Sequence, residues 1–418
     1  MRSMKSCKFL TPILFALLLT CAAPLASAQT YTVLHRFTGT QNDGEVPAGT
    51  LVHDSAGNLY GTTGGGGSGL CDGGCGTVFV LGKSGRELGA FSFDGKDGAS
   101  PSAGLFRDRA GNLYGTTNTG GRYKCGERGY CGTVFQLNRT GTKIRYFSFG
   151  GGDGEGPIAQ PIMFSGTLYG TTQSGGTAGW GTVFAINPQG KETVLHSFEG
   201  ESDGCGPLSG VTADSKGNLY GVTYSGGSQN CGFGAGVAYE VDTAGNFVTL
   251  FTFGGDVGEQ PRSTLTFDPQ GNLYGTAFGG GSYGEGTVFE LSPQNDGTWA
   301  GRALYSFCPA FPDCTDGTGP RGGLAADTAG NLYGVTYYGG AYPAGCGGAG
   351  CGTIFKVDPS GHETVLHNFT GGSDGGNPGG GLIIDASGNL YGTTYVGGDP
   401  SCKSIFGNGC GVVFELTP

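Results

Sequence analysis

The sequence predicts an all-β protein, a seven-bladed β-propeller with four antiparallel strands per blade and an N-terminal strand that closes the last blade. Two observations predict this fold. A Leu-Tyr-Gly tripeptide recurs at spacings of 51 to 59 residues, centred on Tyr60, Tyr114, Tyr169, Tyr220, Tyr274, Tyr333 and Tyr391. A strand typical of the end of a unit also precedes the first unit. Repeats of this length, each with several short strands, are typical of propeller blades.

Composition agrees with short, turn-rich strands. The chain has 91 Gly and 19 Pro among 418 residues, and only 13% of its residues are charged. Such a Gly and Pro content without periodicity would indicate disorder, but here it follows the repeat. Phe and Tyr are common while Met is rare, which favours strands over helices. We therefore expect almost no helix.

The first 28 residues predict a cleaved signal peptide. Three basic residues precede an apolar run, Phe9 to Leu19, that is too short to span a bilayer, and Ala26-Ser27-Ala28 supplies a small-residue cleavage site. Residues 29–418 would then form one propeller domain. The mature chain is expected to be secreted or periplasmic, monomeric and without a membrane segment.

Charge limits the classes of partner that the protein can bind, and cysteine content indicates its compartment. Cleavage leaves 19 Lys plus Arg against 33 Asp plus Glu, a net charge of −14, which argues against nucleic acid as a partner. Twelve cysteines remain, an even number typical of disulfides formed in an oxidising compartment. Five pairs lie close enough in sequence to staple single loops: Cys71 and Cys75, Cys125 and Cys131, Cys308 and Cys314, Cys346 and Cys351, and Cys402 and Cys410. Cys205 and Cys231 lie in two loops of unit four and can pair only if those loops share a face.

The sixth unit shows the predicted elements in order. Gly323 to Ala326 is a short apolar strand, and Asp327-Thr328-Ala329-Gly330 is a hairpin turn. The second strand runs from Asn331 to Thr336, the third from Gly352 to Val357 and the fourth from Glu363 to Phe369. In unit three, Ser165-Gly166 replaces the Asp-x-x-Gly turn, a deletion that a hairpin tip tolerates.

The two ends of the chain predict a closed ring. Tyr31 to Phe37, YTVLHRF, matches the fourth strand ETVLHSF at Glu192 to Phe198. Conversely, the seventh unit stops after its third strand, Val412 to Leu416. The N-terminal strand can therefore complete blade seven and leave no long open edge.

The repeated letters also resemble a known family. The units, with GNLYGTT, a Gly-Gly pair, GTVF and ETVLHSF, resemble the GloVer (Gloeo/Verruco) tandem repeat of exported "choice-of-anchor" bacterial proteins, over essentially all of residues 31–418. The resemblance implies export and a repeat fold, and it implies no particular reaction. Some relatives carry an anchoring segment after the repeats, and none is expected after Phe414-Glu415-Leu416-Thr417-Pro418. The GNLYGTT motif itself is interpreted as architecture, a Gly-Asn turn and a strand.

Histidines and aspartates recur at fixed places in the units. His35, His196 and His367 occupy a fourth-strand position that is Phe or Tyr in other blades, so they are interpreted as packing residues. One carboxylate per unit precedes a proline by four or five residues: Asp43, Asp97, Asp153, Asp203, Asp256, Asp316 and Asp374. We expect these side chains to ring one mouth of the central channel. They are interpreted either as acceptors within their own turns or as a cation site, with calcium the expected ion.

The candidate ligand-binding residues lie on the same face. Aromatic side chains on loops can stack on sugars or pack the loops, and the candidates are Trp180, Tyr224, Tyr283 and Tyr337. Arg262 and Arg321 stand directly after the proline in neighbouring units, where other units carry no charge. We expect their side chains to approach each other. An anion, either Asp256 and Asp316 or a bound carboxylate, is expected to relieve their repulsion.

These features leave three functions open. A secreted binding propeller for an extracellular glycan or protein is favoured, because seven similar blades offer no unique catalytic cluster. A propeller enzyme of the lactonase or polysaccharide lyase type would need acid, base or metal residues at the channel mouth, and no catalytic residue is identified. A structural surface protein without a small ligand is the third. No cofactor is expected apart from calcium.

Overall fold

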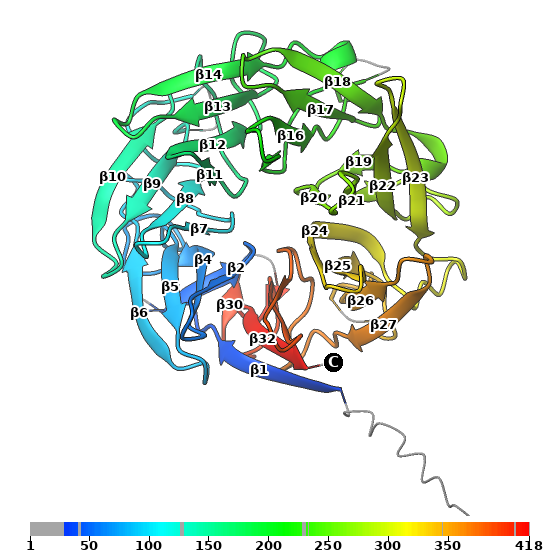
Figure 1. Ribbon diagram of the computed structural model, residues 1–418. Coiled ribbons are helices and arrows are strands. Elements are labelled where there is room, and N and C mark those ends of the chain that lie inside the picture. Colours follow the sequence, from blue (N-terminus) through cyan, green and yellow to red (C-terminus); the bar gives the residue numbers. More distant parts are fainter. Residues whose placement is uncertain are drawn as a thin grey trace, which may run out of the picture.

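The computed structural model describes residues 29–40, 43–125, 129–227, 231–232, 234–344, 346–404 and 407–417. Seven β-sheets stand in a ring around a central axis (Figure 1). The predicted signal peptide lies outside the described residues. Among the described residues, no helix has the length and apolarity needed to cross a membrane.

Each sheet is one blade, and its strands follow one another outward from the axis. Blade 1 contains β2 (Gly44–Pro47), β3 (Val52–His53), β4 (Leu59–Gly66), β5 (Thr77–Leu81) and β6 (Glu87–Ser92). Blade 2 contains β7 (Phe106–Arg107), β8 (Leu113–Thr117), β9 (Thr133–Leu137) and β10 (Lys143–Ser148). Blade 3 contains β11 (Ile162–Phe164), β12 (Thr167–Thr172), β13 (Thr182–Ile186) and β14 (Glu192–Ser197).

The same order continues around the ring. Blade 4 contains β15 (Thr212–Ala213), β16 (Leu219–Val222), β17 (Val237–Val241) and β18 (Phe247–Thr252). Blade 5 contains β19 (Glu259–Pro261), β20 (Thr266–Phe267), β21 (Leu273–Gly279), β22 (Thr287–Pro293) and β23 (Trp299–Ser306). Blade 6 contains β24 (Thr318–Ala326), β25 (Leu332–Tyr338), β26 (Thr353–Val357) and β27 (Glu363–Asn368). Two 3-10 turns, η2 (Glu201–Asp203) and η3 (Gly255–Val257), precede blades 4 and 5.

Blade 7 combines both ends of the chain. Its strands are β28 (Ile383–Ile384), β29 (Leu390–Thr394), β32 (Val412–Thr417) and, outermost, β1 (Thr30–Arg36). A small hairpin, β30 (Lys403–Ser404) with β31 (Gly407–Asn408), lies in the loop of this blade. Antiparallel pairing of β1 with β32 runs from Thr30 opposite Thr417 to Arg36 opposite Val412. The predicted propeller with its closing N-terminal strand is confirmed.

The repeated motif begins with a hydrogen-bonded turn. In blade 1 the Asp54 carboxylate accepts hydrogen bonds from the backbone N–H groups of Ala56 and Asn58, each at 2.9 Å. The Asn58 side-chain amide and the Tyr60 hydroxyl donate to the other Asp54 oxygen, at 2.9 and 3.0 Å. Gly57 has a φ of +81°, which glycine adopts without strain. The Asp, Gly, Asn and Tyr residues of the motif therefore specify the hydrogen-bonded turn before the second strand.

The rest of the motif joins strands and blades. A Cβ at Gly61 would lie 2.4 Å from Cζ of Phe79, so glycine makes room for the aromatic residue of the third strand. The Thr62 hydroxyl donates to the Ala103 carbonyl of blade 2 at 2.7 Å. The next residue, Thr63, hydrogen-bonds Thr77 of the third strand at 2.8 Å. This packing explains why the same residues recur in each unit.

One aromatic contact recurs at every junction between blades. A buried Phe just after each outer strand packs edge-on against the third-strand aromatic residue of the following blade. The pairs are Phe37 with Phe79, Phe93 with Phe135, Phe149 with Phe184, Phe198 with Tyr239, Phe253 with Phe289, Phe307 with Phe355, and Phe369 with Phe414. The closing junction, between blades 7 and 1, therefore has the same contact as the six within the continuous chain.

Candidate functional site

A strained turn leads the chain from each outer strand to the centre of the ring. The residue before the junction proline has a positive φ in every blade, and at Val46, Ser100, Gln260 and Asn377 it is not glycine. Val46 has a φ of +60°, a costly conformation for a β-branched side chain. Its N–H donates to the Cys410 carbonyl of the preceding blade at 2.9 Å. The other six blades have the equivalent bond, so each turn is clamped to its neighbour.

Two positions per blade face the centre next to this turn, and they break the symmetry of the ring. Blades 1 to 7 carry in order, directly after the proline, Ala48, Ser102, Ile158, Leu208, Arg262, Arg321 and Gly379. After the second-strand LYG-x-x segment they carry, in the same order, Gly64, Asn118, Gln173, Tyr224, Phe278, Tyr337 and Tyr395. Blades 4 to 7 thus present aromatic rings and two cations, while blades 1 to 3 present small or amide side chains and one aliphatic residue, Ile158.

These residues form a continuous arginine–aromatic stack, defined as Tyr224, Arg262, Phe278, Arg321 and Tyr337. Cζ of Arg262 lies 4.5 Å from the centre of the Tyr224 ring and 4.4 Å from that of Phe278. Cζ of Arg321 lies 5.6 Å from Phe278 and 4.5 Å from Tyr337. Such contacts stabilise a cation without neutralising it. Tyr395 packs edge-on against Tyr337, with ring centres 5.7 Å apart, and extends the stack to blade 7.

The stack corrects the expected relation between the two arginines. They are neighbours, as expected, but the ring of Phe278 lies between them where Asp256 or Asp316 was expected, and a bound carboxylate stays a prediction. Burial lowers the pKa of Arg262, and the positive charge of Arg321 lowers it further. Nε of Arg262 is buried without a hydrogen-bond partner. Within the described part of the chain, neither guanidinium forms an ion pair with a carboxylate.

A cavity of about 520 Å³ lies beside the stack, and we call it the channel mouth. Arg321, Tyr337 and Tyr395 form one wall, from blades 6 and 7. The opposite wall comes from blades 1 and 2 and is polar, with Glu45, Asp72, Ser100, Ser102 and Asn118 among its residues. Burial raises the pKa of the Glu45 carboxyl. Burial also raises the pKa of Tyr395, and the two arginines oppose that shift.

A second cavity, of about 420 Å³, is lined by Phe278. Its lining includes Glu259, Glu285 and Tyr338 from blade 5, its loop and blade 6. Phe278 therefore lines this second cavity and contacts both arginines. Sequence reasoning missed Phe278 and Tyr395, although aligning the residue that follows each second strand would have placed them beside Tyr224 and Tyr337.

The other predicted ligand-binding residues lie elsewhere. Trp180 is 42% exposed and lies at the rim, where its indole is next to Gly200 of the following junction loop. Tyr283 is 49% exposed and lines a cavity with Leu304 and Tyr305 of the outer strand β23. Of the six candidates, the structure therefore brings together Arg262, Arg321, Tyr224 and Tyr337, and it separates Trp180 and Tyr283 from them.

The seven junction aspartates do not surround the centre, which corrects the expected ring of acids. Asp43 lies 3.4 Å from His35, Asp203 lies 3.1 Å from His196 and Asp374 lies 3.4 Å from His367, and each of these histidines belongs to an outer strand. Asp97 pairs with Lys143 at 2.7 Å and Asp316 accepts the Tyr305 hydroxyl at 2.8 Å, again from outer strands. Asp153 lies near Glu192 of the outer strand β14, and Asp256 shares a cavity with β23.

Most of these aspartates also accept backbone N–H groups of their own loops, including those of Thr38, Asp94, Gly150, Glu199, Cys308 and Thr370. The repeated Asp thus ties the junction loop to the outer strand. Among the described residues, one group has metal-holding geometry, Glu45 with Cys402 and Cys410, and its two cysteines form a disulfide. Calcium binding by the aspartates stays a prediction.

Buried carboxyls recur beside these aspartates at the outer edge. Burial raises the pKa of Glu192 to about 7, and the negative charge of Asp153 adds to the shift. Burial and Asp316 likewise raise the pKa of Glu363 to about 7. These groups lie at blade junctions and are remote from the channel mouth.

All six expected disulfides are present, and they hold loops on the face that carries the stack. They join Cys71 to Cys75, Cys125 to Cys131, Cys205 to Cys231, Cys308 to Cys314, Cys346 to Cys351, and Cys402 to Cys410. The bond between Cys205 and Cys231 shows that their two loops share a face. Carbonyls of Cys75, Cys131, Cys351 and Cys410 accept the N–H groups of the strained turns. The disulfides therefore support the backbone from which the site is built.

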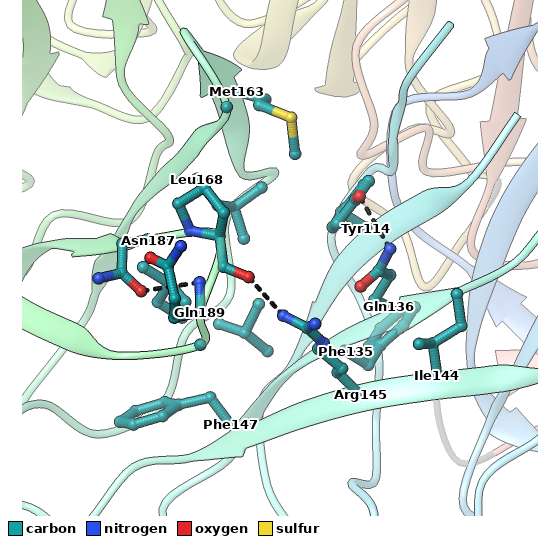
Figure 2. Close-up of a pocket in the computed structure, with 15 residues that line it drawn as sticks. Tyr114, Phe135, Gln136, Ile144, Arg145, Phe147, Met163, Leu168, Asn187 and Gln189 are labelled. Carbon is teal, nitrogen blue, oxygen red and sulfur yellow. Dashed lines mark hydrogen bonds between the residues drawn. The ribbon is translucent and has the colours of Figure 1, made fainter. Parts of the chain in front are cut away.

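The largest cavity described, of about 690 Å³, lies between blades 2 and 3 (Figure 2). Its lining is mostly apolar and includes Ile144, Met163 and Leu168. Arg145 spans it by donating to the Pro188 carbonyl at 2.5 Å. A similar cavity, of about 510 Å³, occupies the corresponding junction of blades 5 and 6. Its recurrence marks it as a feature of blade packing, whereas the channel mouth is unlike any symmetry-related position.

The comparisons with known structures agree with the fold. Streptogramin B lyase is 12% identical, with a TM-score of 0.57 over 93% of this chain and 97% of that one. A fungal alcohol oxidase of the AA5 family is 14% identical, with a TM-score of 0.53 over 93% of this chain and 76% of that one. An extracellular domain of a two-component system protein from B. thetaiotaomicron is 14% identical, with a TM-score of 0.52 over 90% of this chain but 39% of that one. At these identities the likeness shows the fold alone.

The sequence comparisons give the family. No curated protein sequence matches the chain. The model of the Gloeobacter/Verrucomicrobia repeat matches residues 123–346 and 304–418. These matches cover most of the chain, and the motifs within them are those that the structure places in the second, third and outer strands of each blade. The chain therefore belongs to the Gloeobacter/Verrucomicrobia repeat family.

Proposed function

We propose that this protein is an extracellular binding propeller that receives part of a glycan at the channel mouth. The observation that carries the proposal is the arginine–aromatic stack on one wall of a cavity whose opposite wall is polar. Six disulfides support an extracellular address, because such bonds persist in oxidising compartments.

The shape and chemistry of the cavity suit a sugar. Its volume of about 520 Å³ falls in the range of small-molecule sites. Tyr337 and Tyr395 line the cavity, and aromatic rings pack against the C–H groups of sugars. Ser100, Ser102 and Asn118 supply hydroxyl and amide groups for hydrogen bonds to sugar hydroxyls. The strained, clamped turns hold these groups in place before a ligand arrives.

The test is a glycan array probed with the purified mature protein and with two tyrosine variants. Tyr337→Ala removes a wall of the channel mouth. Tyr283→Ala is the matched control, because it removes an exposed tyrosine beside an outer strand. We expect the first change to abolish glycan binding and the second to leave it unchanged. Equal binding by both variants would place the ligand elsewhere, and an array without any bound glycan would favour the structural-protein alternative.

An enzyme of the lactonase or lyase type is the second candidate, and Glu45 is the observation that favours it. This carboxyl lines the channel mouth, and burial shifts its pKa upward, the direction that a general acid near neutral pH requires. Products released from any glycan that binds would reveal turnover. Glu45→Gln should then remove turnover while glycan binding persists. A bound glycan that stays intact over days would rule this candidate out.

A further inference from the structure

Two half-buried arginines at the centre of the ring differ from the cations of this protein that pair with carboxylates. Lys143 pairs with Asp97 at 2.7 Å, and the Arg302 guanidinium lies 2.5 Å from Glu290. Arg262 and Arg321 have aromatic neighbours in place of carboxylates within the described residues. A half-buried positive charge without a counter-ion is costly, and two of them in one stack repel each other. Neither guanidinium has a carboxylate within ion-pair distance in the described structure, although Glu45 and Asp72 line the same cavity as Arg321.

The ring contacts also decide which N–H groups of each guanidinium remain for a ligand. Aromatic rings interact with the face of a guanidinium and accept none of the hydrogen bonds that lie in its plane. Nε of Arg262 is buried without a partner, and Arg321 is the arginine that lines the channel mouth. An acceptor for donors of this kind lies in the guanidinium plane, and a carboxylate fits because its two oxygens can accept two parallel N–H groups.

The nearby acids of the protein do not fill this role. Asp316 accepts the Tyr305 hydroxyl and the Cys308 N–H at the outer edge of the junction. Asp256 lies in η3 and shares its cavity with outer-strand residues. Glu45 lines the channel mouth opposite Arg321, and no ion pair joins them in the described structure.

From this geometry we infer that the glycan bound at the channel mouth carries a carboxylate, as in a hexuronic acid, that in-plane N–H groups of Arg321, which lines the cavity, hold it, and that Arg262 on the other side of Phe278 adds its positive charge. The inference rests on the proposed function and names its ligand class. A sugar acid is favoured over an acidic peptide because the cavity is compact, with a wall of Ser100, Ser102 and Asn118 that suits hydroxyl groups next to the carboxylate. The tyrosines opposite suit the C–H face of the same sugar ring.

The experiment measures binding of sugar acids as monosaccharides and short oligomers by calorimetry at fixed ionic strength. The probes are galacturonate, glucuronate, mannuronate and guluronate, each beside its methyl ester and the neutral hexose. Loss of hydrogen bonds to a charged group should weaken the ester and the hexose by about tenfold to one hundredfold. Inorganic sulfate and an acidic peptide are run beside them.

Variants test the arginines directly. Arg262→Ala with Arg321→Ala should abolish binding of the sugar acid. Arg262→Lys with Arg321→Lys keeps the charge and removes the planar fork, so it should fold and still bind at least about tenfold more weakly. The matched control, Arg109→Ala with Arg139→Ala, removes the same charge from exposed hairpin turns and should leave binding unchanged.

Each contrary outcome has one meaning. Equal affinity for acid and ester, or unchanged binding by the lysine pair, overturns the carboxylate inference and leaves the proposed glycan function standing. Binding of sulfate or of the acidic peptide without any sugar acid overturns the inference and the glycan function together. Neutral sugars that bind while all sugar acids fail overturn the inference alone.

Discussion

The closing junction of the ring can be tested with one side chain. Phe37 follows the outer strand of blade 7, is 1% exposed and packs edge-on against Phe79 of blade 1 with ring centres 5.1 Å apart. Phe93 makes the same contact with Phe135 between blades 1 and 2, at 4.9 Å. Phe37 also belongs to a buried cluster with Cys410 and Val413 near the C-terminus, so it joins segments from the two ends of the chain, whereas Phe93 joins neighbouring units. If the ring is closed in solution, the two residues should contribute equally.

The magnitude follows from burial. Replacing a fully buried Phe by Ala typically costs about 3–5 kcal/mol of stability, from lost transfer free energy and from the cavity left behind. Phe37→Ala and Phe93→Ala should therefore lower the free energy of unfolding by similar amounts. The effect is large, because natural domains are stable by only about 5–15 kcal/mol. Were β1 frayed in solution, Phe37→Ala would cost close to nothing.

The assay is urea unfolding of oxidised protein followed by tyrosine fluorescence and circular dichroism. Both variants should move the midpoint to lower urea by a similar amount, with the same slope. A large loss for Phe93→Ala beside an unchanged midpoint for Phe37→Ala would refute the closed ring. A reduced slope for Phe37→Ala alone would mean that blade 7 unfolds separately from the rest.

Four further predictions concern stability and covalent state. A chain that begins at Thr38 lacks β1 and leaves β32 as an open edge, so it should aggregate or melt earlier, and size-exclusion chromatography will show which. Thiol titration of denatured, unreduced mature protein should find no free thiol, since all twelve cysteines are paired, and one thiol or more per chain would contradict the pairing. Gly115→Ala places a Cβ 2.4 Å from Cζ of Phe135 and should lower the free energy of unfolding by about 1–3 kcal/mol. Adding Phe135→Leu shortens the facing side chain and should restore part of this loss. A double variant no more stable than Gly115→Ala would show that the clash is not the cause. Folding raises the pKa values of Glu192 and Glu363 from 4.5 to about 7, so the folded state binds more protons than the unfolded chain between these pH values. The free energy of unfolding should therefore fall as pH rises from 4.5 to 7 and then level off. Glu192→Gln with Glu363→Gln should flatten that slope, and an unaltered slope would point to other groups.

Much of the fold could be predicted from the sequence because repeats and turns are local. The spacing of the Leu-Tyr-Gly tripeptides predicts seven units, and the unmatched strands at the two ends predict closure, since each needs a partner for its backbone groups. Disulfides within single loops were predictable for the same reason, because their cysteines are at most eight residues apart. The equivalent positions of Arg262 and Arg321 likewise followed from counting within the repeat.

Only the tertiary structure decided how far each residue lies from the axis. A junction loop runs from the outermost strand of one blade to the innermost strand of the next, so the four-residue step from an Asp to its Pro can span roughly 13 Å. The sequence offset does not reveal the radius at which each end lies, and Asp316 therefore lies with Tyr305 at the outer edge while Arg321 reaches the centre. Phe278 came between the two arginines because side chains from different strands meet across a blade, a contact set by packing in three dimensions. The sequence by itself thus determined the ring of blades and the blades that carry the arginines, and the packing at the centre determined what those arginines contact.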